Sequence, residues 1–496
     1  MAGKTSNITG DRLEKLEALK NSGINPYPSK VIFELEKISS AKEAGGKEVA
    51  AAGRILGWRA HGEIIFADLR DQTGEIQIWF QKKNLGKDFE TVKLFDIGDF
   101  LAVKGKVVKT KAGEITIDVS EFQLLSKALK SLPNEWHGLK DIEDRFRKRY
   151  LDLLLNPDVK KRFETRSLLI REIRRYLDNL GFQEVETPTL QPLYGGANAK
   201  PFTTHVNMLD TDMYLRIADE LYLKRLIVGG YEKVYEICKD FRNEGLDLTH
   251  QPEFTMIEYY EAYADYHRVM DVTEGLFKHL AKEVLGGTSI QVGEKTIDLG
   301  GKWPRMRMVD IIKEKLKLDV SKESSESLTA YCRKNGIELV GGESKGQLIF
   351  TIFDHKVTGS LVEPTWIIDY PKEVSPLSKD KADDPGFVER FEGYIGGREI
   401  CDGWSELTDP QEQRKRFESD VKAARKDKEE AQQVDENFLE AMEYGMPPIG
   451  GIGIGIDRLT MFFTNTWSIK EVILYPLMRP LANKVQKRKR VIKDER

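Results

Sequence analysis

A group of acidic residues around an indole is the first feature of this sequence that could bind a charged ligand. Residues 397–410 read GREICDGWSELTDP and carry four carboxylates, at Glu399, Asp402, Glu406 and Asp409. In a strand, alternate side chains share a face, so Asp402, Trp404 and Glu406 would point one way and the acid at 399 the other. Two carboxylates flanking an indole suit a cationic ligand. The alternative is a solvated edge strand decorated with charge, and these residues alone leave both interpretations open.

A second group combines an arginine with an aromatic ring. Residues 235–266 predict a strand that ends at Arg242, a turn, and a returning strand from Phe254. Such a hairpin would gather Arg242, Glu244, His250 and Phe254 around one pocket. A guanidinium binds phosphate oxygens and a ring stacks on a base, so the pair suits a nucleotide. An ordinary hairpin with surface charge is the alternative.

A glycine-rich segment near the end of the chain carries another arginine. Residues 450–463, GGIGIGIDRLTMFF, predict a strand followed by a helix that begins near Arg458. The spacing is GxGxG, which does not fit the GxGxxG dinucleotide fingerprint. Glycines here would let the backbone approach a ligand or a neighbouring strand, and Arg458 at a helix start could meet phosphate.

Short alternating strands with turn residues fill residues 49–126 and predict a five-stranded barrel of the OB type, a fold that commonly holds single-stranded nucleic acid. Within it Arg59, Phe66, Gln77 and Trp79 combine rings with hydrogen-bonding groups, as stacking on a base and contacting its edge require. The alternative is that Phe66 and Trp79 belong to the barrel core.

Bulk properties narrow the class of protein. A chain of 496 residues needs two or three domains. Lys and Arg number 77 against 81 Asp and Glu, which excludes a protein that is basic all over but leaves room for a local basic face. The three cysteines form no CxxC pair, so we expect neither a disulfide framework nor a thiolate zinc site, and a reducing cytosol fits. No signal peptide or membrane span is expected.

Composition shifts divide the chain into four parts. We expect an N-terminal helical extension (1–48), the barrel (49–130), a charged linker (131–158) and one large domain of helices and strands (159–496). A helical insertion is expected at about 305–348. The final residues, NKVQKRKRVIKDER, form a basic tail that is typical of a solvated terminus.

Taken together, these segments resemble the class II aminoacyl-tRNA synthetases, and most closely the lysyl-tRNA synthetase family. The resemblance covers nearly the whole chain. LGFQEVETPTLQP with Pro188 matches the first class signature, FRNEG…HQPEFTMIEYY the second and GIGIGIDRL the third. GGANAKPF, RIADELYLKRLIVGG, YPKEVSPLS and VILYPLMRP are similar to the lysine subgroup.

The resemblance implies an α+β fold: a five-stranded OB-fold barrel that binds the anticodon, followed by a catalytic domain built on an antiparallel sheet with flanking helices. It implies ATP-dependent ligation of L-lysine to tRNA(Lys) through a lysyl-adenylate, with Mg²⁺ accompanying ATP. Positioning and charge neutralisation supply most of the acceleration of such a reaction. A cytoplasmic homodimer, with Pro188 at the interface, is also implied.

Residue roles follow from the same resemblance. Arg242 and Arg458 would be catalytic, and ATP would be bound by Arg242, Glu244, His250, Phe254 and Arg458. Lysine would be bound by Gly196, Glu220, Glu258, Tyr260, Asp402, Trp404 and Glu406. Glu392 and Glu399 would carry the metal, and Arg59, Phe66, Gln77 and Glu121 would contact the anticodon.

Two residues depart from the family pattern. Lysyl-tRNA synthetases usually have Asn and then Phe or Tyr where this chain has Asp402 and Trp404. A charged Asp402 would repel the substrate carboxylate unless a cation, a proton or a shifted side chain compensates. The aspartyl or asparaginyl branch would need cationic side-chain recognition, whereas this pocket is acidic.

Two further alternatives have other functions. Ligases that attach lysine to protein lack the anticodon barrel, which residues 49–126 supply. A catalytically inactive scaffold would be expected to lose phosphate or metal residues, yet Arg242, Glu392, Glu399 and Arg458 are all present.

Overall fold

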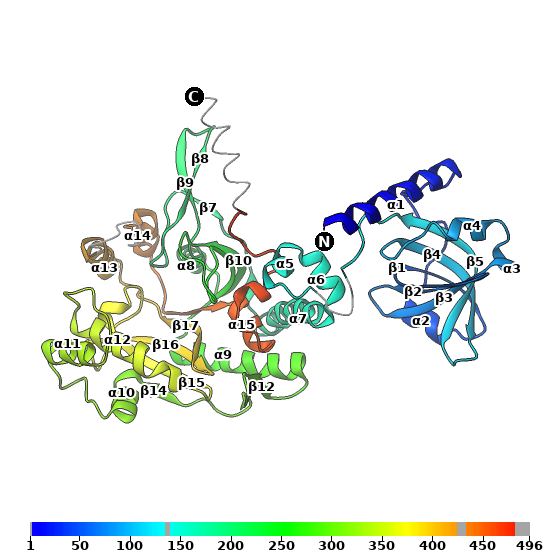
Figure 1. The fold of residues 1–496 in the computed structure, drawn as a ribbon. Coiled ribbons are helices and arrows are strands. Elements are labelled where there is room, and N and C mark those ends of the chain that lie inside the picture. Colours follow the sequence, from blue (N-terminus) through cyan, green and yellow to red (C-terminus); the bar gives the residue numbers. More distant parts are fainter. Residues whose placement is uncertain (1, 134–138, 424–432, 482–496) are drawn as a thin grey trace. The chain divides into compact units, whose positions relative to one another are not determined.

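The computed structural model describes residues 2–133, 139–423 and 433–481, and the chain forms two compact units, residues 1–140 and 141–496 (Figure 1). The basic residues at 484–490 lie outside the described part. All three cysteines are buried with free thiols. Among the described residues, no helix combines the length and the apolar character that crossing a bilayer requires.

The first unit is a closed five-stranded barrel, as predicted, with strand order β1-β2-β3-β5-β4. Alternate residues of each strand fill its interior, for example Ile65, Ala67 and Leu69 of β2. Helices α1 and α2 pack against this core through Leu19, Ile38 and Ala41. The elements are α1 (Ala2–Asn21), α2 (Ile38–Glu43), β1 (Glu48–His61), β2 (Ile64–Arg70), β3 (Glu75–Gln81), α3 (Lys82–Leu85), α4 (Asp88–Val92), β4 (Phe100–Lys109) and β5 (Ile115–Ser126).

The second unit is built on an eight-stranded sheet with the order β14-β15-β16-β17-β18-β11-β10-β6. Only the two outermost pairs, β14 with β15 and β10 with β6, are parallel. The strands of this unit are β6 (Gln183–Glu184), β7 (Leu190–Gln191), β8 (Phe202–Val206), β9 (Thr211–Leu215), β10 (Lys233–Phe241), β11 (Glu253–Ala262), β12 (Ser289–Val292), β13 (Lys295–Asp298), β14 (Arg305–Arg307), β15 (Thr365–Pro371), β16 (Phe387–Ile395), β17 (Arg398–Ser405) and β18 (Ile449–Gly455).

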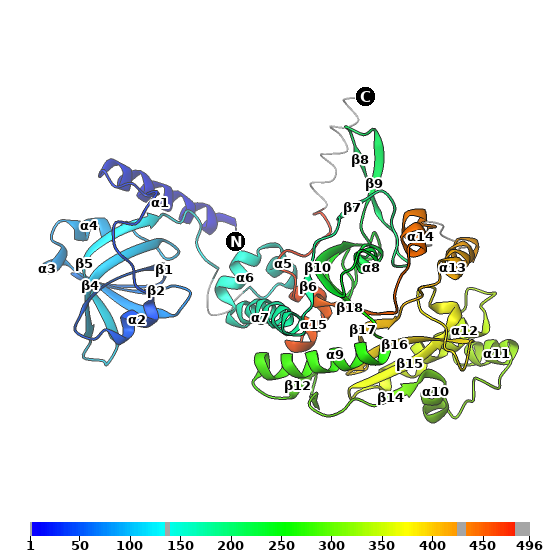
Figure 2. The same ribbon diagram turned by 180° about the vertical axis from the view of Figure 1, so that it is seen from behind.

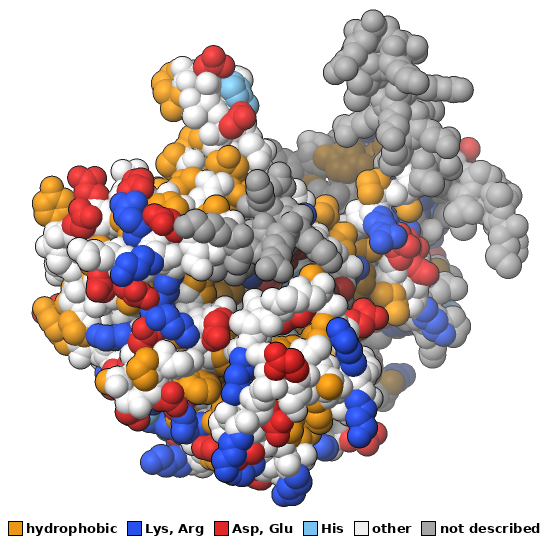
Figure 3. Space-filling view, turned by 90° about the vertical axis from the view of Figure 1, so that its left-hand side faces the viewer, with side chains coloured by type: hydrophobic (Ala, Val, Ile, Leu, Met, Phe, Trp, Pro, Cys, Tyr) orange, Lys and Arg blue, Asp and Glu red, His pale blue; other side chains and the backbone are white. Residues whose placement is uncertain are grey.

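Helices surround this sheet, and the hairpin of β8 and β9 projects away from it in both ribbon views (Figures 1 and 2). The helices are α5 (Ile142–Arg147), α6 (Arg149–Leu155), α7 (Pro157–Asn179), α8 (Glu220–Val228), α9 (Tyr266–Leu280), α10 (Met308–Leu316), α11 (Ser325–Lys334), α12 (Lys345–Lys356), α13 (Pro410–Ala423), α14 (Glu436–Glu443) and α15 (Ile456–Phe463). Short turns of other helix types are η2 (Ala281–Leu285), η3 (Thr358–Ser360), η4 (Lys372–Val374) and η5 (Ile469–Glu471). Figure 3 shows positive and negative side chains interspersed over the face that it draws, as the balanced composition predicts.

The two faces of the sheet differ in polarity, because successive residues of each strand point to opposite faces. One face joins the main hydrophobic core with helices α7, α9 and α15, to which β11 contributes Ile257 and Tyr259. Glu258 and Tyr260, between and beyond them, belong to the opposite face. A covered apolar face therefore holds the strands rigidly while the other face is left to carry polar groups.

Several observed helices and strands lie within the segments predicted from the sequence. The segment proposed as a linker, 131–158, contains α5 and α6, and α7 starts at Pro157. The helical insertion comprises α10, α11 and α12, and it packs on the β15 and β16 side of the sheet. The hairpin strands predicted around Arg242 are β10 and β11, and β10 ends one residue before Arg242.

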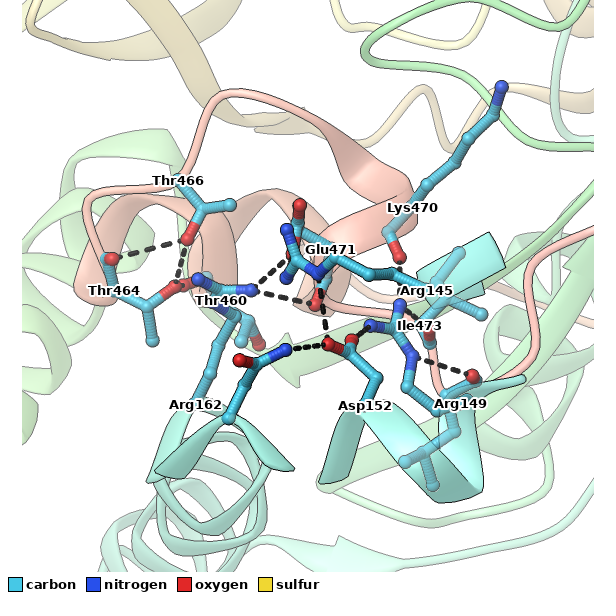
Figure 4. A network of polar contacts seen from close by, with 12 residues as sticks. Arg145, Arg149, Asp152, Arg162, Thr460, Thr464, Thr466, Lys470, Glu471 and Ile473 are labelled. Atoms are coloured by element: carbon cyan, nitrogen blue, oxygen red, sulfur yellow. Dashed lines mark hydrogen bonds and ion pairs between the residues drawn. The ribbon is translucent and has the colours of Figure 1, made fainter. Parts of the chain in front are cut away.

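A buried ion-pair network fastens the first helices of this unit to the segment after α15 (Figure 4). Arg149 and Asp152 are fully buried and paired at 2.5 Å. Arg149 also donates to the carbonyls of Lys470 and Leu474, and Asp152 accepts from Arg145 at 2.9 Å. The network is stable although it is buried, because every charge in it has a partner. Removing one member would leave the others buried without a counter-ion.

Asp152→Ala should therefore lower the free energy of unfolding by about 3–5 kcal/mol, since it leaves the Arg149 guanidinium buried without its counter-ion. Chemical denaturation of the full chain, followed by tryptophan fluorescence, measures the loss. Lys148→Ala is the matched control: Lys148 pairs with Asp144 at 3.0 Å with side chains 46% and 49% exposed. Its removal should change stability by less than about 0.5–1 kcal/mol. Equal losses in the two variants would contradict the role given to the network.

Candidate active site

A cavity of about 370 Å³ lies on the polar face of the large sheet. Residues from β11, β17, β18, α15 and the loop after β10 line it. Most of the residues predicted for lysine, ATP and the metal come together here: Gly196, Glu220, Arg242, Glu244, His250, Phe254, Glu258, Tyr260, Glu399, Asp402, Trp404 and Arg458. Glu392 and Glu406 are absent from the cavity wall and lie buried behind it.

The glycine-rich strand β18 forms part of the floor of this cavity. Its isoleucines Ile452 and Ile454 belong to the main core, whereas the alternating glycines Gly453 and Gly455 line the cavity. A Cβ atom on Gly451 would lie 2.3 Å from the Tyr260 ring and 2.6 Å from Glu406 Oε1. The GxGxG pattern thus permits a close approach of side chains and backbone, as predicted from the sequence.

One end of the site is acidic and already contains an ammonium group. Lys224 is buried and its Nζ contacts the carboxylates of both Glu220 and Glu406. Trp404 donates its indole N–H to Glu406 at 2.7 Å. Burial raises the pKa of Glu406 to about 8, although Lys224 opposes the rise. Glu406 Oε1 still has no hydrogen-bond partner among the described residues. The charge of this end is therefore incompletely compensated.

Glu258 and Tyr260 extend the acidic end along β11. The Tyr260 hydroxyl donates to Glu258 at 2.7 Å. Burial raises the pKa of Glu258 to about 8, and the negative charges of Glu220 and Asp240 add to the rise. A bound ammonium group would reverse this, because a nearby opposite charge favours the ionised carboxylate.

The unusual Asp402 has a cation of its own. Arg390 on β16 donates from Nε and Nη2 to the two oxygens of Asp402, both at 2.9 Å, and also to Glu392 at 2.7 Å. Burial raises the pKa of Asp402 to about 6 despite this pairing. The sequence suggested that a cation, a proton or a shifted side chain could compensate the charge of Asp402, and Arg390 is such a cation.

The other end of the cavity carries positive charge and an aromatic ring. The Arg242 guanidinium lies over the Phe254 ring, 5.1 Å from its centroid. Arg458 approaches His250 at 3.3 Å and Glu399 at 3.6 Å, and His250 is held by Asp247 at 2.7 Å. Glu244 is exposed beside them.

Asp457 anchors the helix that carries Arg458. It pairs with Arg166 of α7 at 2.5 Å and accepts from the backbone N–H of Thr255 at 2.7 Å. The third signature is thereby tied to the second, so the arginine and the ring hold a fixed separation.

The strand prediction for residues 397–410 needs one correction. Uninterrupted alternation would place Glu399 opposite Asp402, yet both line the cavity. The register of β16 with β17 shifts between Gly393 and Tyr394, so that one strand carries an extra residue and the facing reverses. Asp409 accepts from the N–H groups of Gln411 and Glu412 and caps α13, as its place before Pro410 indicates.

The two residues predicted to carry the metal differ in their fitness for it. Glu399 is half-exposed at the cavity wall, where Arg458 lies 3.6 Å from one of its oxygens and the hard carboxylate suits a divalent cation. Glu392 is buried, and its two oxygens accept from Arg390 at 2.7 Å and from the Tyr394 hydroxyl at 2.5 Å. Burial raises its pKa to about 8. Glu399 fits a divalent ion as it stands, whereas Glu392 would first have to release a donor.

In the barrel, Arg59, Phe66 and Gln77 lie on neighbouring strands with Trp79. Arg59 is opposite Phe66, and Phe66 is opposite Trp79, with ring centroids 5.7 Å apart. Both rings are half-buried on the outer face between buried residues, so the core interpretation is wrong for them. This surface of Arg59, Phe66, Gln77 and Trp79 is the aromatic patch.

Glu121 lies elsewhere, where β5 pairs with β4, and it accepts from Lys104 at 3.2 Å. The carboxylates that act on Arg59 are Asp68, which pairs with it at 2.6 and 2.8 Å, and the more distant Glu114 and Glu75. The structure therefore does not place Glu121 with the other three residues.

Sequence reasoning missed Lys224 and Arg390, the two cations that balance the predicted acids. Each had a local signal. Lys224 follows Glu220 by four residues in a helical segment, where side chains meet. Arg390 stands two residues before Glu392 in a strand, on the same face.

Comparison with known proteins agrees with this geometry. A family model for tRNA synthetases class II (D, K and N) matches residues 141–479, and one for the OB-fold nucleic acid binding domain matches residues 49–125. A lysine–tRNA ligase of Thermoanaerobacter pseudethanolicus is 49% identical over 476 residues, covering 95% of each chain. The lysine–tRNA ligase of Bacillus subtilis is 48% identical, covering 94% of this chain and 96% of its own.

A third relative, lysine–tRNA ligase 2 of Methanosarcina mazei, is 50% identical over 479 residues, with 94% of this chain and 93% of its own covered. The family model spans well over half of the chain, and the relatives span nearly all of it. The chain therefore belongs to the class II tRNA synthetases of the D, K and N group.

Proposed function

We propose a role for each part of the pocket in the reaction that this chain catalyses, the ATP-dependent ligation of L-lysine to tRNA(Lys) through a lysyl-adenylate. The observation that carries the assignment is a single cavity with a carboxylate-rich end and an arginine-and-aromatic end. The first end suits the two ammonium groups of lysine, and the second suits a nucleotide.

At the acidic end, Gly196 and Glu220 bind the α-amino group, while Glu258, Tyr260 and Glu406 bind the side-chain ammonium. Trp404 forms an aromatic wall and holds Glu406 through its indole N–H. Support comes from Lys224, since an ammonium group already rests between Glu220 and Glu406. Asp402 acts on lysine only indirectly, because both its oxygens are bound to Arg390.

At the other end, Phe254 stacks on adenine after Arg242 leaves the ring to hold the α-phosphate and the lysine carboxylate. Glu244 accepts from the adenine amino group, and His250 and Arg458 lie against the outer phosphates. A lysine carboxylate oxygen attacks the α-phosphorus, and the bond to pyrophosphate breaks. The terminal hydroxyl of tRNA then attacks the acyl carbon and AMP leaves. Arg242 and Arg458 stabilise the charge that develops.

Magnesium would accompany ATP in this proposal; Glu399 would hold it, and Glu392 would have to give up the hydrogen bond from Tyr394 or Arg390 before it could hold the ion too. When bound, the ion neutralises phosphate charge. The aromatic patch of the barrel stacks on anticodon bases. We place the enzyme in the cytoplasm as a homodimer, with Pro188 at the interface.

Pyrophosphate exchange tests the reaction directly. With each of the twenty amino acids in turn, labelled pyrophosphate should enter ATP only when lysine is present. Lysine-independent exchange, or exchange that depends on aspartate or asparagine, would contradict the assignment of lysine as the amino-acid substrate.

Glu406→Gln should raise the KM for lysine in this exchange by about 30-fold or more, since removing one partner of a buried charge pair costs about 2–5 kcal/mol. The KM for ATP should change far less, because Glu406 is at the opposite end of the site. Glu440→Gln on α14, an exposed position, is the control and should match the wild type. A variant Glu406→Gln with unchanged lysine KM would contradict the role of this acid.

Phe66→Ala should weaken tRNA(Lys) binding by about 5- to 150-fold, the range expected for losing one stacked base. Lysine-dependent pyrophosphate exchange should be unaffected, since the barrel takes no part in it. Phe100→Ala is the matched control: Phe100 is a 37% exposed phenylalanine on β4, away from the aromatic patch. Equal loss in both variants would show that the patch has no special part in tRNA binding. Aminoacylation at varied tRNA concentration provides the measurement.

A further inference from the structure

A fully buried acid with no donor lies behind the lysine end of the cavity. Asp219 precedes helix α8, a position where aspartate usually caps the helix, but its side chain makes no capping bond. Its carboxylate is 0% exposed, and neither oxygen accepts a hydrogen bond from a donor among the described residues. An unpaired carboxylate in such a place costs several kcal/mol, so something must neutralise it.

Other acids surround Asp219. Carboxylate oxygens of Asp219, Asp240 and Glu258 lie within 4.8 Å of one another, and so do ligand atoms of Asp219, Glu236 and Cys238. The Asp219 and Glu258 carboxyl groups are close enough to hydrogen-bond. Two ionised carboxylates have no proton to donate, so this contact requires one of the pair to be protonated.

The available cations already serve other acids. Arg216 donates to Glu236 at 2.7 Å and lies 3.4 Å from Asp240. Glu236 also accepts from Thr187 at 2.7 Å. Lys224 is engaged by Glu220 and Glu406. With a guanidinium on one side of the cluster, a divalent metal would meet like charge as well as ligands, which favours a proton as the neutralising group.

We infer that Asp219 keeps a proton, donates it to Glu258, and thereby positions the Glu258 carboxylate for the side-chain ammonium of lysine. Lysine binding draws Glu258 toward its ionised form and releases part of the proton population of the pair. The inference rests on the lysine-binding role proposed for Glu258. Asp219 is given no contact with substrate and acts only through Glu258, so it is a positioning residue.

The surroundings favour retention of the proton. Burial raises the pKa of Asp219 well above its usual range, and the charges of Glu258, Asp240 and Glu236 add to this. The other groups that face the pair come from its own helix, from β10 and β11, and from the ends of β9 and β10: Glu220, Glu236, Cys238, Asp240, Tyr260, Arg216 and Arg242. Lys224 and Glu406 lie one step further away.

Lysine binding and proton binding are linked because the two compete for the same carboxyl groups. Protons and the lysine ammonium both favour the same acid pair, so each weakens the binding of the other. Lysine affinity should therefore rise with pH from 6 to 8, and binding at pH 7 should release protons, on the order of 0.5 per lysine. Asp219→Asn supplies an N–H donor that does not titrate. Burial and the charges of Glu220 and Asp240 still raise the pKa of Glu258 in this variant, so lysine affinity and its pH dependence should both stay close to the wild type.

Calorimetry of lysine binding without ATP, at pH 7 in two buffers of different ionisation enthalpy, counts the protons released by the full-length protein. The ratio of Kd at pH 6 to Kd at pH 8 should be about tenfold in the wild type and in Asp219→Asn alike. Asp219→Ala, which has no donor, should bind lysine about tenfold more weakly than Asp219→Asn. Asp310→Asn on α10, an exposed position, should match the wild type.

Three results would overturn the inference: no proton release by the wild type, lysine binding by Asp219→Asn as weak as that of Asp219→Ala, or lysine binding that EDTA abolishes and Mn²⁺ restores. The last would mean that the cluster holds a metal ion. A folded wild-type protein that binds no lysine at all would overturn the proposed function instead, and with it the role of Asp219.

Discussion

The cost of burying carboxylates is the constraint on which the rest of this site depends. Glu220 of α8 and the sheet residues Glu258 and Glu392, together with Glu406 just after β17, are each less than 8% exposed. Each would cost several kcal/mol if it were ionised without a partner. Lys224 and Arg390 pair with some of these carboxylates within the chain. Protons neutralise others, since the pKa values of Glu258 and Glu406 are raised to about 8. The substrate supplies the remaining positive charge.

The sheet tolerates this concentration of charge because one face is packed in the hydrophobic core and only the other face carries the acids. Ile257, Tyr259 and Ile452 pack against α7, α9 and α15 on one side. That apolar face holds β11 and β18 in register whatever the charge state of the other face. A residue on the polar face, such as Glu258, can therefore change its partner without disturbing the core. The buried network of Arg149 and Asp152 has a different purpose, since its charges are matched within the protein and fix the surrounding helices.

Much of this organisation could be predicted from the sequence, and the failures have physical causes. The barrel followed from period-two alternation, and the shared pocket of Arg242, Glu258 and Glu399 followed from the resemblance to the family. The facing of Glu399 could not be derived, because a one-residue register shift at Gly393 is invisible in the alternation pattern. The separation of Glu121 from the aromatic patch was hidden for a related reason: β5 pairs with β3 at one end and with β4 along its length.

The partners of the acids were harder to foresee than the acids. A strand or helix pattern shows which residues share a face, but the balance of charge depends on elements far apart in sequence. Arg390 compensates Asp402 across a hairpin, and Lys224 joins Glu220 to Glu406, which lies 182 residues later along the chain. This arrangement also bears on selectivity. A neutral analogue of lysine would leave carboxylates such as Glu406 and Glu258 buried and short of a cation, and a site built around unpaired polar groups rejects such an analogue far more strongly than a shape mismatch alone would.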